Sequence, residues 1–205
     1  MAIPPRLALL CALLPHALAF SDARRATRPS RSMRRAAPPL ALSFERVPLH
    51  HAADAFRLEI SSYPPDEAAS LQKLTLRLTD APQYFWGAYD ASGALRGFVC
   101  GTLTADSSLT EESMSTHEPS GTTLCIHSVV TEASCRRQGV GSWMMQEYLA
   151  RVAAEGHVRR VLLLCKEGLV GFYEDAGFSN RGDSGVEHGQ DNWILMERVL
   201  GDARG

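Results

Sequence analysis

Residues 125–152 read CIHSVVTEASCRRQGVGSWMMQEYLARV, and this stretch decides the fold. Its first residues, Cys125 to Val130, have the composition of a buried strand, and the segment from Gly139 onward has the pattern of a helix. Gly139 and Gly141 allow the backbone between them to curl so that successive N–H groups point into one concavity. The helix N-terminus adds free N–H groups and the positive end of its dipole. The stretch therefore predicts a loop that binds a diphosphate.

The spacing of this loop excludes two common phosphate-binding motifs, because it is neither GxGxxG nor GxxxxGK[ST]. It resembles the R/Q-x-x-G-x-G/A loop of the GNAT superfamily of acyl-CoA N-acyltransferases, which follows the fourth strand and holds the CoA pyrophosphate. The resemblance implies that acetyl-CoA is the cosubstrate and that the preceding strand binds the acetyl carbonyl and pantetheine through its backbone. The implied cofactor-binding residues are Val129, Val130, Thr131, Arg136, Arg137, Gln138, Gly139, Val140, Gly141 and Ser142.

Three further segments extend the resemblance to roughly residues 41–200. FYEDAGF at 172–178 is similar to the FYxxxGF segment of the superfamily. SSYPPDEAASL at 61–71 and ESMSTH at 112–117 resemble the arylalkylamine N-acetyltransferases of the non-vertebrate type. The resemblance implies acetyl-CoA-dependent N-acetylation of an arylalkylamine such as serotonin or tryptamine. Two other functions stay open: acetylation of a polyamine or another small amine, and a non-catalytic acyl-CoA-binding module.

The amine chemistry requires a base, because an alkylammonium with a pKa near that of lysine, about 10.4, must lose a proton before it attacks a thioester. His127 is the first candidate, and strand alternation predicts that it shares a face with Cys125 and Val129. Vertebrate relatives carry two histidines here, and Cys125 stands in place of the first. Glu67 is the second candidate, in a turn where insect-type relatives are thought to use a glutamate. A hydrogen-bonded core histidine and a solvated first-turn acid are the structural alternatives.

Tyr173 matches the tyrosine that, in the superfamily, donates a proton to the CoA sulfur or hydrogen-bonds to it. A phenol with a pKa near 10 stays protonated at neutral pH and can act as an acid. Its structural alternative is an aromatic packing residue beside Phe172. The three tryptophans, Trp86, Trp143 and Trp193, are interpreted as packing residues rather than as an amine cage.

Residues 1–40 differ from the rest of the chain and are interpreted as a disordered targeting leader, followed by one domain over residues 41–205. LALLCALLPHALAF at 7–20 has the pattern of a signal peptide, and the Arg-rich, acid-poor segment at 21–37 that of a transit peptide. This order resembles the bipartite leaders of algae with secondary plastids. We therefore expect a plastid location, with the secretory pathway and the cytoplasm as alternatives.

Charge and cysteine content restrict the partners. Residues 1–37 carry a net charge of +6 and the whole chain −2, which leaves −8 on the remainder. An acidic domain argues against nucleic acid and suits a cationic amine. The cysteines of the domain have no CxxC spacing, so we expect no metal and no disulfide framework. We further expect a monomer with no membrane association in the mature form.

The coarse pattern predicts the element order β-α-α-β-β-β-α-β-α-β-β. Helices are expected at 52–61 and 66–78 around a Pro-Pro break, and at 139–154 and 169–176. The last two strands are expected at 178–181 and 193–199. This order gives an α/β fold with a mixed sheet. The resemblance to the GNAT superfamily implies that this sheet is of the GNAT type, mostly antiparallel and flanked by helices.

Overall fold

The computed structural model describes residues 41–106, 109, 116–188 and 191–201. The predicted leader and residues 112–115 of the ESMSTH segment lie outside the described residues. The strands are β1 Ser43–Arg46, β2 Phe85–Tyr89, β3 Leu95–Thr104, β4 Thr123–Thr131, β5 Arg160–Cys165, β6 Ser179–His188 and β7 Asp191–Val199. The helices are α1 Ala52–Ile60, α2 Leu71–Asp80, α4 Val140–Glu155 and α5 Val170–Asp175, with short 3₁₀ turns at Leu49–His51, Pro82–Tyr84, Ala133–Cys135 and Glu167–Leu169.

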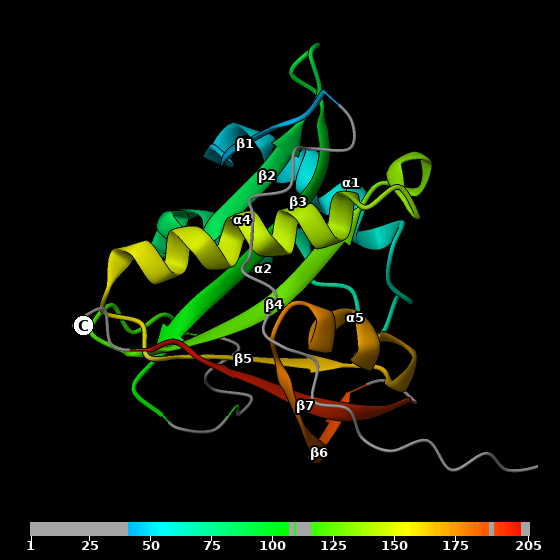
Figure 1. Ribbon diagram of the computed structural model, residues 1–205. Helices are drawn as coiled ribbons and strands as arrows, with labels where there is room; N and C mark the ends of the chain where they lie inside the picture. The colour runs from blue at the N-terminus through cyan, green and yellow to red at the C-terminus, as the bar shows by residue number, and fades with distance from the viewer. Residues whose placement is uncertain (1–40, 107–108, 110–115, 189–190, 202–205) are drawn as a thin grey trace, which may run out of the picture. The chain divides into compact units, whose positions relative to one another are not determined.

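The strands form one sheet in the order β1-β2-β3-β4-β5-β7-β6. Every neighbouring pair is antiparallel except β4 and β5, which run parallel. Helix α4 runs across one face of the sheet, and α1 and α2 lie behind the sheet in the same view (Figure 1). The mixed, mostly antiparallel sheet flanked by helices is the fold class that the sequence predicts.

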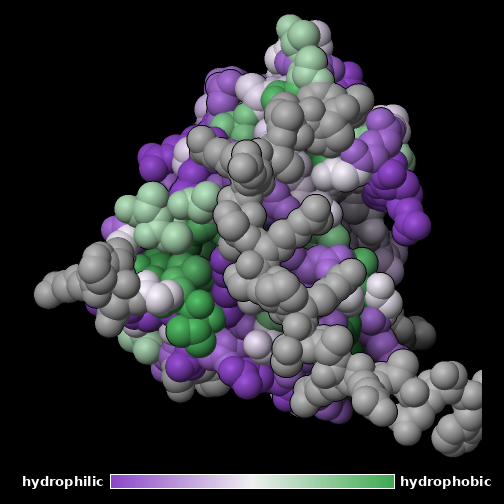
Figure 2. All heavy atoms as spheres, viewed as in Figure 1, coloured by the Kyte–Doolittle hydropathy of each residue, from purple (hydrophilic) through white to green (hydrophobic). Residues whose placement is uncertain are grey.

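Two separate cores reflect this arrangement. Met144, Met145 and Tyr148 of α4 are fully buried against strand residues such as Leu124 and Ile126. On the other face, α1 and α2 pack on Phe98, Cys100 and Val130, among others. The view in Figure 2 shows hydrophilic residues over much of the described surface, interrupted by hydrophobic patches. Within the described ranges, the helices lack the combined length and apolarity that a bilayer crossing requires.

The second helix begins later than the sequence predicts. Helix α2 starts at Leu71 rather than at residue 66, because Ser70 is its N-cap and accepts a hydrogen bond from the Lys73 N–H at 3.2 Å. Residue Ala69, just before the cap, donates its N–H to the Glu59 carboxylate at 2.9 Å. The YPPDEA segment is therefore a loop that leads from α1 into α2.

A β-bulge interrupts β4 at His127. Cys100 pairs with Ser128 and Gly101 pairs with Ile126, which leaves His127 as the extra residue between them. His127 hydrogen-bonds to Thr102, and Ser128 to Glu59 of α1, so both side chains lie on the α1/α2 face. Val129 packs against the core on the α4 face instead. The predicted shared face of His127 and Val129 is therefore wrong, because the bulge shifts the alternation by one residue.

Candidate active site

The loop before α4 adopts the conformation that anion binding requires. Gly139, the N-cap of α4, has φ 81°, and Arg137 has φ 61°, a left-handed value that is uncommon for a residue other than glycine. No side chain caps the N-terminus of α4, so its first N–H groups remain available to a ligand. Arg136, Arg137 and Gln138 are exposed at this end of the helix. The backbone and the cations of this loop fit a pyrophosphate group.

Arg136 also connects this loop to other parts of the site. Its Nε donates to the Thr131 carbonyl at 2.9 Å, and its Nη2 donates to the Ser62 hydroxyl at 2.9 Å. Thr131 ends β4, and Ser62 follows α1. The loop that fits the pyrophosphate is thus in direct contact with the segment that leads into the YPPDEA loop.

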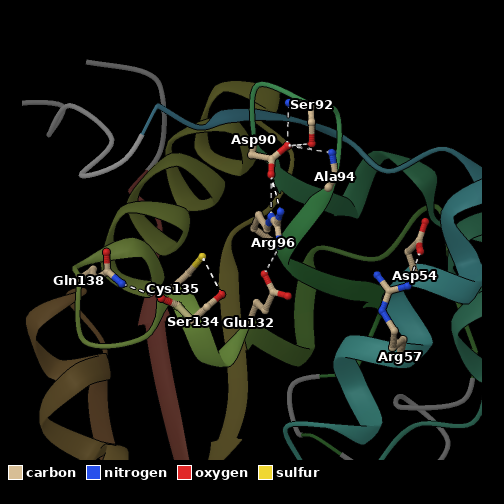
Figure 3. Close-up of polar contacts among 10 residues, drawn as sticks. All are labelled: Asp54, Arg57, Asp90, Ser92, Ala94, Arg96, Glu132, Ser134, Cys135 and Gln138. Carbon is tan, nitrogen blue, oxygen red and sulfur yellow. Dashed lines mark hydrogen bonds and ion pairs between the residues drawn. The ribbon is translucent and has the colours of Figure 1, made fainter.

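A second arginine, Arg96, stabilises the start of the loop that precedes α4. Arg96 points between Asp90 and Glu132 (Figure 3), with N–O distances of 2.7 Å to each carboxylate. Hydrogen bonds from Ser92 and Arg96 hold the pKa of Asp90 well below its usual value. The same carboxylates raise the pKa of Arg96, so the guanidinium stays charged. Because Glu132 directly follows β4, this network connects the β2–β3 turn to the start of the loop.

Strands β4 and β5 separate on the way to this loop. Their pairing covers Thr123–Ile126 of β4 and Arg160–Leu163 of β5 and includes no residue beyond the Ile126–Leu163 pair. The backbone of Val129, Val130 and Thr131, which the sequence assigns to acetyl and pantetheine binding, lies beyond that point. These backbone groups are therefore not paired with β5.

His127 is held in a desolvated position. Its Nε2 lies 2.7 Å from the Thr102 hydroxyl, and its Nδ1 is buried without a hydrogen-bond partner among the described residues. Burial, together with the charges of Arg77 and Lys73, lowers the pKa of His127 well below its ordinary value of 6.5. The imidazole is consequently neutral at neutral pH and holds an additional proton weakly.

Glu59 of α1 is a buried acid in the same region, and the sequence analysis did not single it out. Its residue exposure is 2%, and its Oε1 accepts hydrogen bonds from the Ala69 N–H at 2.9 Å and the Ser128 hydroxyl at 3.1 Å. Burial raises its pKa, against the lowering effect of those hydrogen bonds and of Arg77. Its Oε2 has no partner among the described residues, which costs about 1–3 kcal/mol for a buried acceptor.

Two tyrosines meet beside β4. Burial and the nearby phenol of Tyr63 raise the pKa of Tyr173 well above 10, so the Tyr173 hydroxyl keeps its proton. Burial and the Glu59 carboxylate raise the pKa of Tyr63, while a hydrogen bond from the Val129 backbone lowers it. The Tyr63 hydroxyl thus reaches the backbone position at which the sequence analysis expects the acetyl carbonyl. Tyr173 also packs edge-on against Phe172 and Phe178.

Glu67 is engaged in an ion pair. Its Oε1 lies 2.8 Å from the Lys166 Nζ, and its side chain is 3% exposed. The Lys166 Nζ also lies 5.7 Å from the centre of the Trp193 ring. Because its carboxylate oxygen contacts the Lys166 ammonium group, Glu67 is engaged in a structural ion pair, which weighs against it as the base.

The same lysine and tryptophan line the larger cavity. It measures about 580 Å³ and lies between the end of β5, the 3₁₀ turn that follows, and strands β6 and β7. Its lining includes one aromatic ring, Trp193, and two acids, Glu167 and Asp183. Trp193 therefore borders a cavity, whereas Trp143 belongs to the core and Trp86 packs against it, as interpreted from the sequence.

A smaller cavity of about 240 Å³ lies against α2. It is lined by residues of α2 together with Thr102 and His117. Thr102 therefore contacts both this cavity and the His127 ring. In the described part of the chain, no three His, Cys, Asp or Glu side chains gather as a metal site would require. Cys100, Cys125, Cys135 and Cys165 are all buried.

The sheet, the α4 loop and the separation of β4 from β5 define an acyl-CoA-type transferase fold, and comparison with known proteins agrees. Residues 49–178 match the acetyltransferase (GNAT) family. The chain belongs to this family.

Similar curated proteins are serotonin N-acetyltransferases. The protein from Mesocricetus auratus is 33% identical over 123 residues, which cover 60% of this chain and 59% of the relative. The protein from Pan troglodytes is 28% identical over 179 residues, which cover 87% of this chain and 82% of the relative. The match to the hamster protein thus spans about three-fifths of that relative's length.

Solved structures share the fold at low sequence identity. A GphF GNAT-like decarboxylase in complex with isobutyryl-CoA has a TM-score of 0.69 and 17% identity, over 78% of this chain and all of that chain. A phosphinothricin acetyltransferase from Sinorhizobium meliloti in complex with AcCoA has a TM-score of 0.61 and 16% identity, over 81% of this chain and 92% of that chain. At these identities the likeness concerns the fold alone.

Proposed function

We propose that this protein catalyses acetyl-CoA-dependent N-acetylation of a small amine, and that the amine is an arylalkylamine. The observation that carries this proposal is the position of Tyr173. Its buried, protonated hydroxyl lies near Tyr63, and the Tyr63 hydroxyl contacts the Val129 backbone beyond the point at which β4 and β5 separate. A thioester that pairs with this backbone would present its sulfur to a protonated phenol.

In this reaction the chain has three tasks. The α4 loop holds the pyrophosphate through backbone N–H groups and Arg137, and the β4 backbone orients the acyl group. A base removes one proton from the ammonium group of the amine, whose nitrogen then forms the amide bond as the carbon–sulfur bond breaks. Tyr173 donates its proton to the departing thiolate, and its phenolate regains a proton through water from the adduct nitrogen, which must lose a second proton to become an amide.

The larger cavity supports a cationic aromatic acceptor. Trp193 offers an aromatic ring, and Glu167 and Asp183 bring negative charge to the same lining. The similarity to serotonin N-acetyltransferases also favours an arylalkylamine. The two acids also support a second candidate, a polyamine, because several ammonium groups could pair with them.

A thiol-release assay tests the proposal. Purified protein and acetyl-CoA are mixed with tryptamine, serotonin, spermidine or no amine, and free CoA is followed over time. We expect amine-dependent release with the highest kcat/KM for tryptamine or serotonin. Higher kcat/KM for spermidine would assign the polyamine function. Tight CoA binding without amine-dependent release would instead identify a non-catalytic acyl-CoA-binding module.

A further inference from the structure

Glu59 is a buried acid that reaches the centre of the site from the far end of α1. It shares one carboxylate oxygen between the Ala69 N–H, in the loop before α2, and the Ser128 hydroxyl, on β4. Ser128 directly follows His127 at the bulge and directly precedes Val129. The carboxyl group is therefore fixed beside the part of β4 at which acyl transfer is proposed to occur.

The second carboxylate oxygen of Glu59 makes neither of these hydrogen bonds. It is buried and has no hydrogen-bond partner among the described residues. The Nδ1 of His127 is likewise buried without a partner among them, on the same face of the sheet. Buried polar atoms without a partner are unusual in a native protein, and the one on Glu59 indicates a position that a polar ligand or a proton occupies during function.

The groups around Glu59 include both positively and negatively charged side chains. The positive charge of Arg77 on α2 acts to lower the pKa values of Glu59, Cys100 and His127. Lys73 of the same helix also lowers the pKa of His127. The negative charge of Glu59 raises the pKa values of Cys100 on β3 and of Tyr63 in the loop. Glu67 also raises the pKa of Tyr63. Tyr63 connects Glu59 to the Val129 backbone and to Tyr173.

We propose that Glu59 is the proton acceptor for the amine, a role that rests on the proposed acetylation. The Oε2 of Glu59 takes one proton from the ammonium group, and the lone pair released on nitrogen attacks the thioester carbon. Glu59 becomes a neutral carboxylic acid. The carbon–sulfur bond breaks as Tyr173 protonates the thiolate, and the adduct nitrogen passes its second proton through water to the Tyr173 phenolate, which leaves a neutral amide and a neutral phenol. The proton on Glu59 leaves to water after the amide departs, which restores the carboxylate.

The electrostatics favour Glu59 over the other two bases. Burial raises its pKa toward the working pH, and this is where a general base is most effective. The pKa of His127 moves in the opposite direction, because burial and two nearby cations disfavour the imidazolium. Glu67 has its carboxylate against the Lys166 ammonium. In this arrangement His127 positions the Thr102 hydroxyl and, because it is neutral, adds no charge to the surroundings of Glu59.

Glu59→Gln tests this role, because the amide keeps the size of the side chain and an oxygen for the Ala69 N–H and the Ser128 hydroxyl. We expect kcat for tryptamine to fall on the order of 10²–10⁴-fold with CoA affinity unchanged, and the acidic limb of the pH–kcat profile to disappear. The matched control is Glu147→Gln, a buried glutamate on α4 that pairs with Arg151. We expect near-native kcat from that variant.

Thermal stability provides a readout that does not depend on activity. A carboxyl whose pKa is raised in the folded state contributes stability below its unfolded pKa of about 4.5 and loses that contribution as pH rises through the folded value. Glu59→Gln removes this pH-dependent loss of stability, because an amide does not titrate. The Tm of the variant minus that of the wild type should therefore increase as pH rises from about 4.5 towards neutrality. A purely structural role would instead show as Tm and CoA affinity that fall together with kcat.

The outcomes separate the two proposals. An active wild type whose Glu59→Gln variant keeps kcat within about twofold and retains the acidic limb would overturn the role of Glu59 and leave the acetylation intact. Loss of kcat together with a large fall in Tm at all pH values would also overturn it. A wild-type protein that releases no CoA with any amine would overturn the acetylation, and the role of Glu59 with it.

Discussion

At the scale of single residues, Tyr173 offers the most direct test of catalysis. Tyr173→Phe removes only the hydroxyl, and the ring contacts with Phe172 and Phe178 remain. We expect kcat to fall on the order of 10²–10⁴-fold, because a general acid contributes about that much. The measurement is thiol release under saturating amine and acetyl-CoA.

Tyr89→Phe is the control for this substitution, because the Tyr89 hydroxyl is buried without a partner among the described residues. Its removal should leave kcat near the wild-type value. A Tyr173→Phe variant with a kcat within about twofold of the wild type would show that the hydroxyl is dispensable, provided that product release is not the slow step.

The residues of the site were predictable to the extent that they lie in local patterns. The α4 loop and Tyr173 stand in short motifs whose spacing is visible in the chain. Glu59 does not, since its partner Ser128 is 69 positions away and only the packing of α1 on the sheet brings the two together. The one available signal was an acid on the otherwise apolar inner face of α1. Lys166 was missed for a similar reason, because it meets Glu67 across 99 positions.

At the scale of elements, the N-terminus of α4 should control CoA binding. Gly139→Val would place a β-branched side chain at φ 81° and next to the N–H groups that face the pyrophosphate. We expect calorimetry to show CoA affinity lowered at least tenfold in a folded variant. Gly156→Val imposes a similar backbone strain, at φ 75°, but at the C-terminus of the same helix. If both variants lose CoA affinity equally, the effect is a general loss of stability and the assignment of the loop is wrong.

The ion-pair network of Arg96 at the start of the α4 loop gives a second prediction. Arg96→Met removes the bridge from Asp90 to Glu132, so the loop should become less ordered and the KM for acetyl-CoA should rise. We expect a rise of roughly 3- to 10-fold, because ion pairs that are partly exposed to solvent make only modest contributions. kcat should change little, because the network lies away from Tyr173.

Arg57→Met is the matched control, since Arg57 forms an exposed ion pair with Asp54 within α1 (Figure 3). Its KM for acetyl-CoA should equal that of the wild type. An Arg96→Met variant with an unchanged KM would show that the loop holds its conformation without this bridge.

Most helices and strands could be predicted from the periodicity of hydrophobic residues and from turn residues. The exceptions have local causes. The start of α2 moved because Ser70 is a better N-cap than the predicted site, where the chain instead forms a loop held by Glu59. β6 extends over Ser179–His188, beyond the predicted end at 181, because pairing with β7 supports a polar strand. The bulge at His127 could not be predicted, since a period of two carries no sign of an inserted residue.

At the scale of the whole molecule, the first 40 residues should be separable from the enzyme. We propose that they direct the protein to a plastid in two steps, a signal-like segment and then a transit-like segment. A fluorescent fusion of the full chain should therefore locate to the plastid, and a fusion that begins at residue 41 should stay in the cytosol. Replacement of Phe20, at the junction of the two segments, should stop delivery at the secretory pathway. A full-length fusion found in the cytosol would refute the bipartite leader.

The four described cysteines, all buried in the sheet or beside it, have a practical consequence for labelling chemistry. Burial raises the pKa of the Cys100 and Cys165 thiols, so their reactive thiolate forms are scarce. A maleimide dye should react slowly with these positions while the protein is folded. A cysteine placed on an exposed residue such as Arg137 would be modified much faster, and its fluorescence could report the arrival of the nucleotide end of CoA without any turnover.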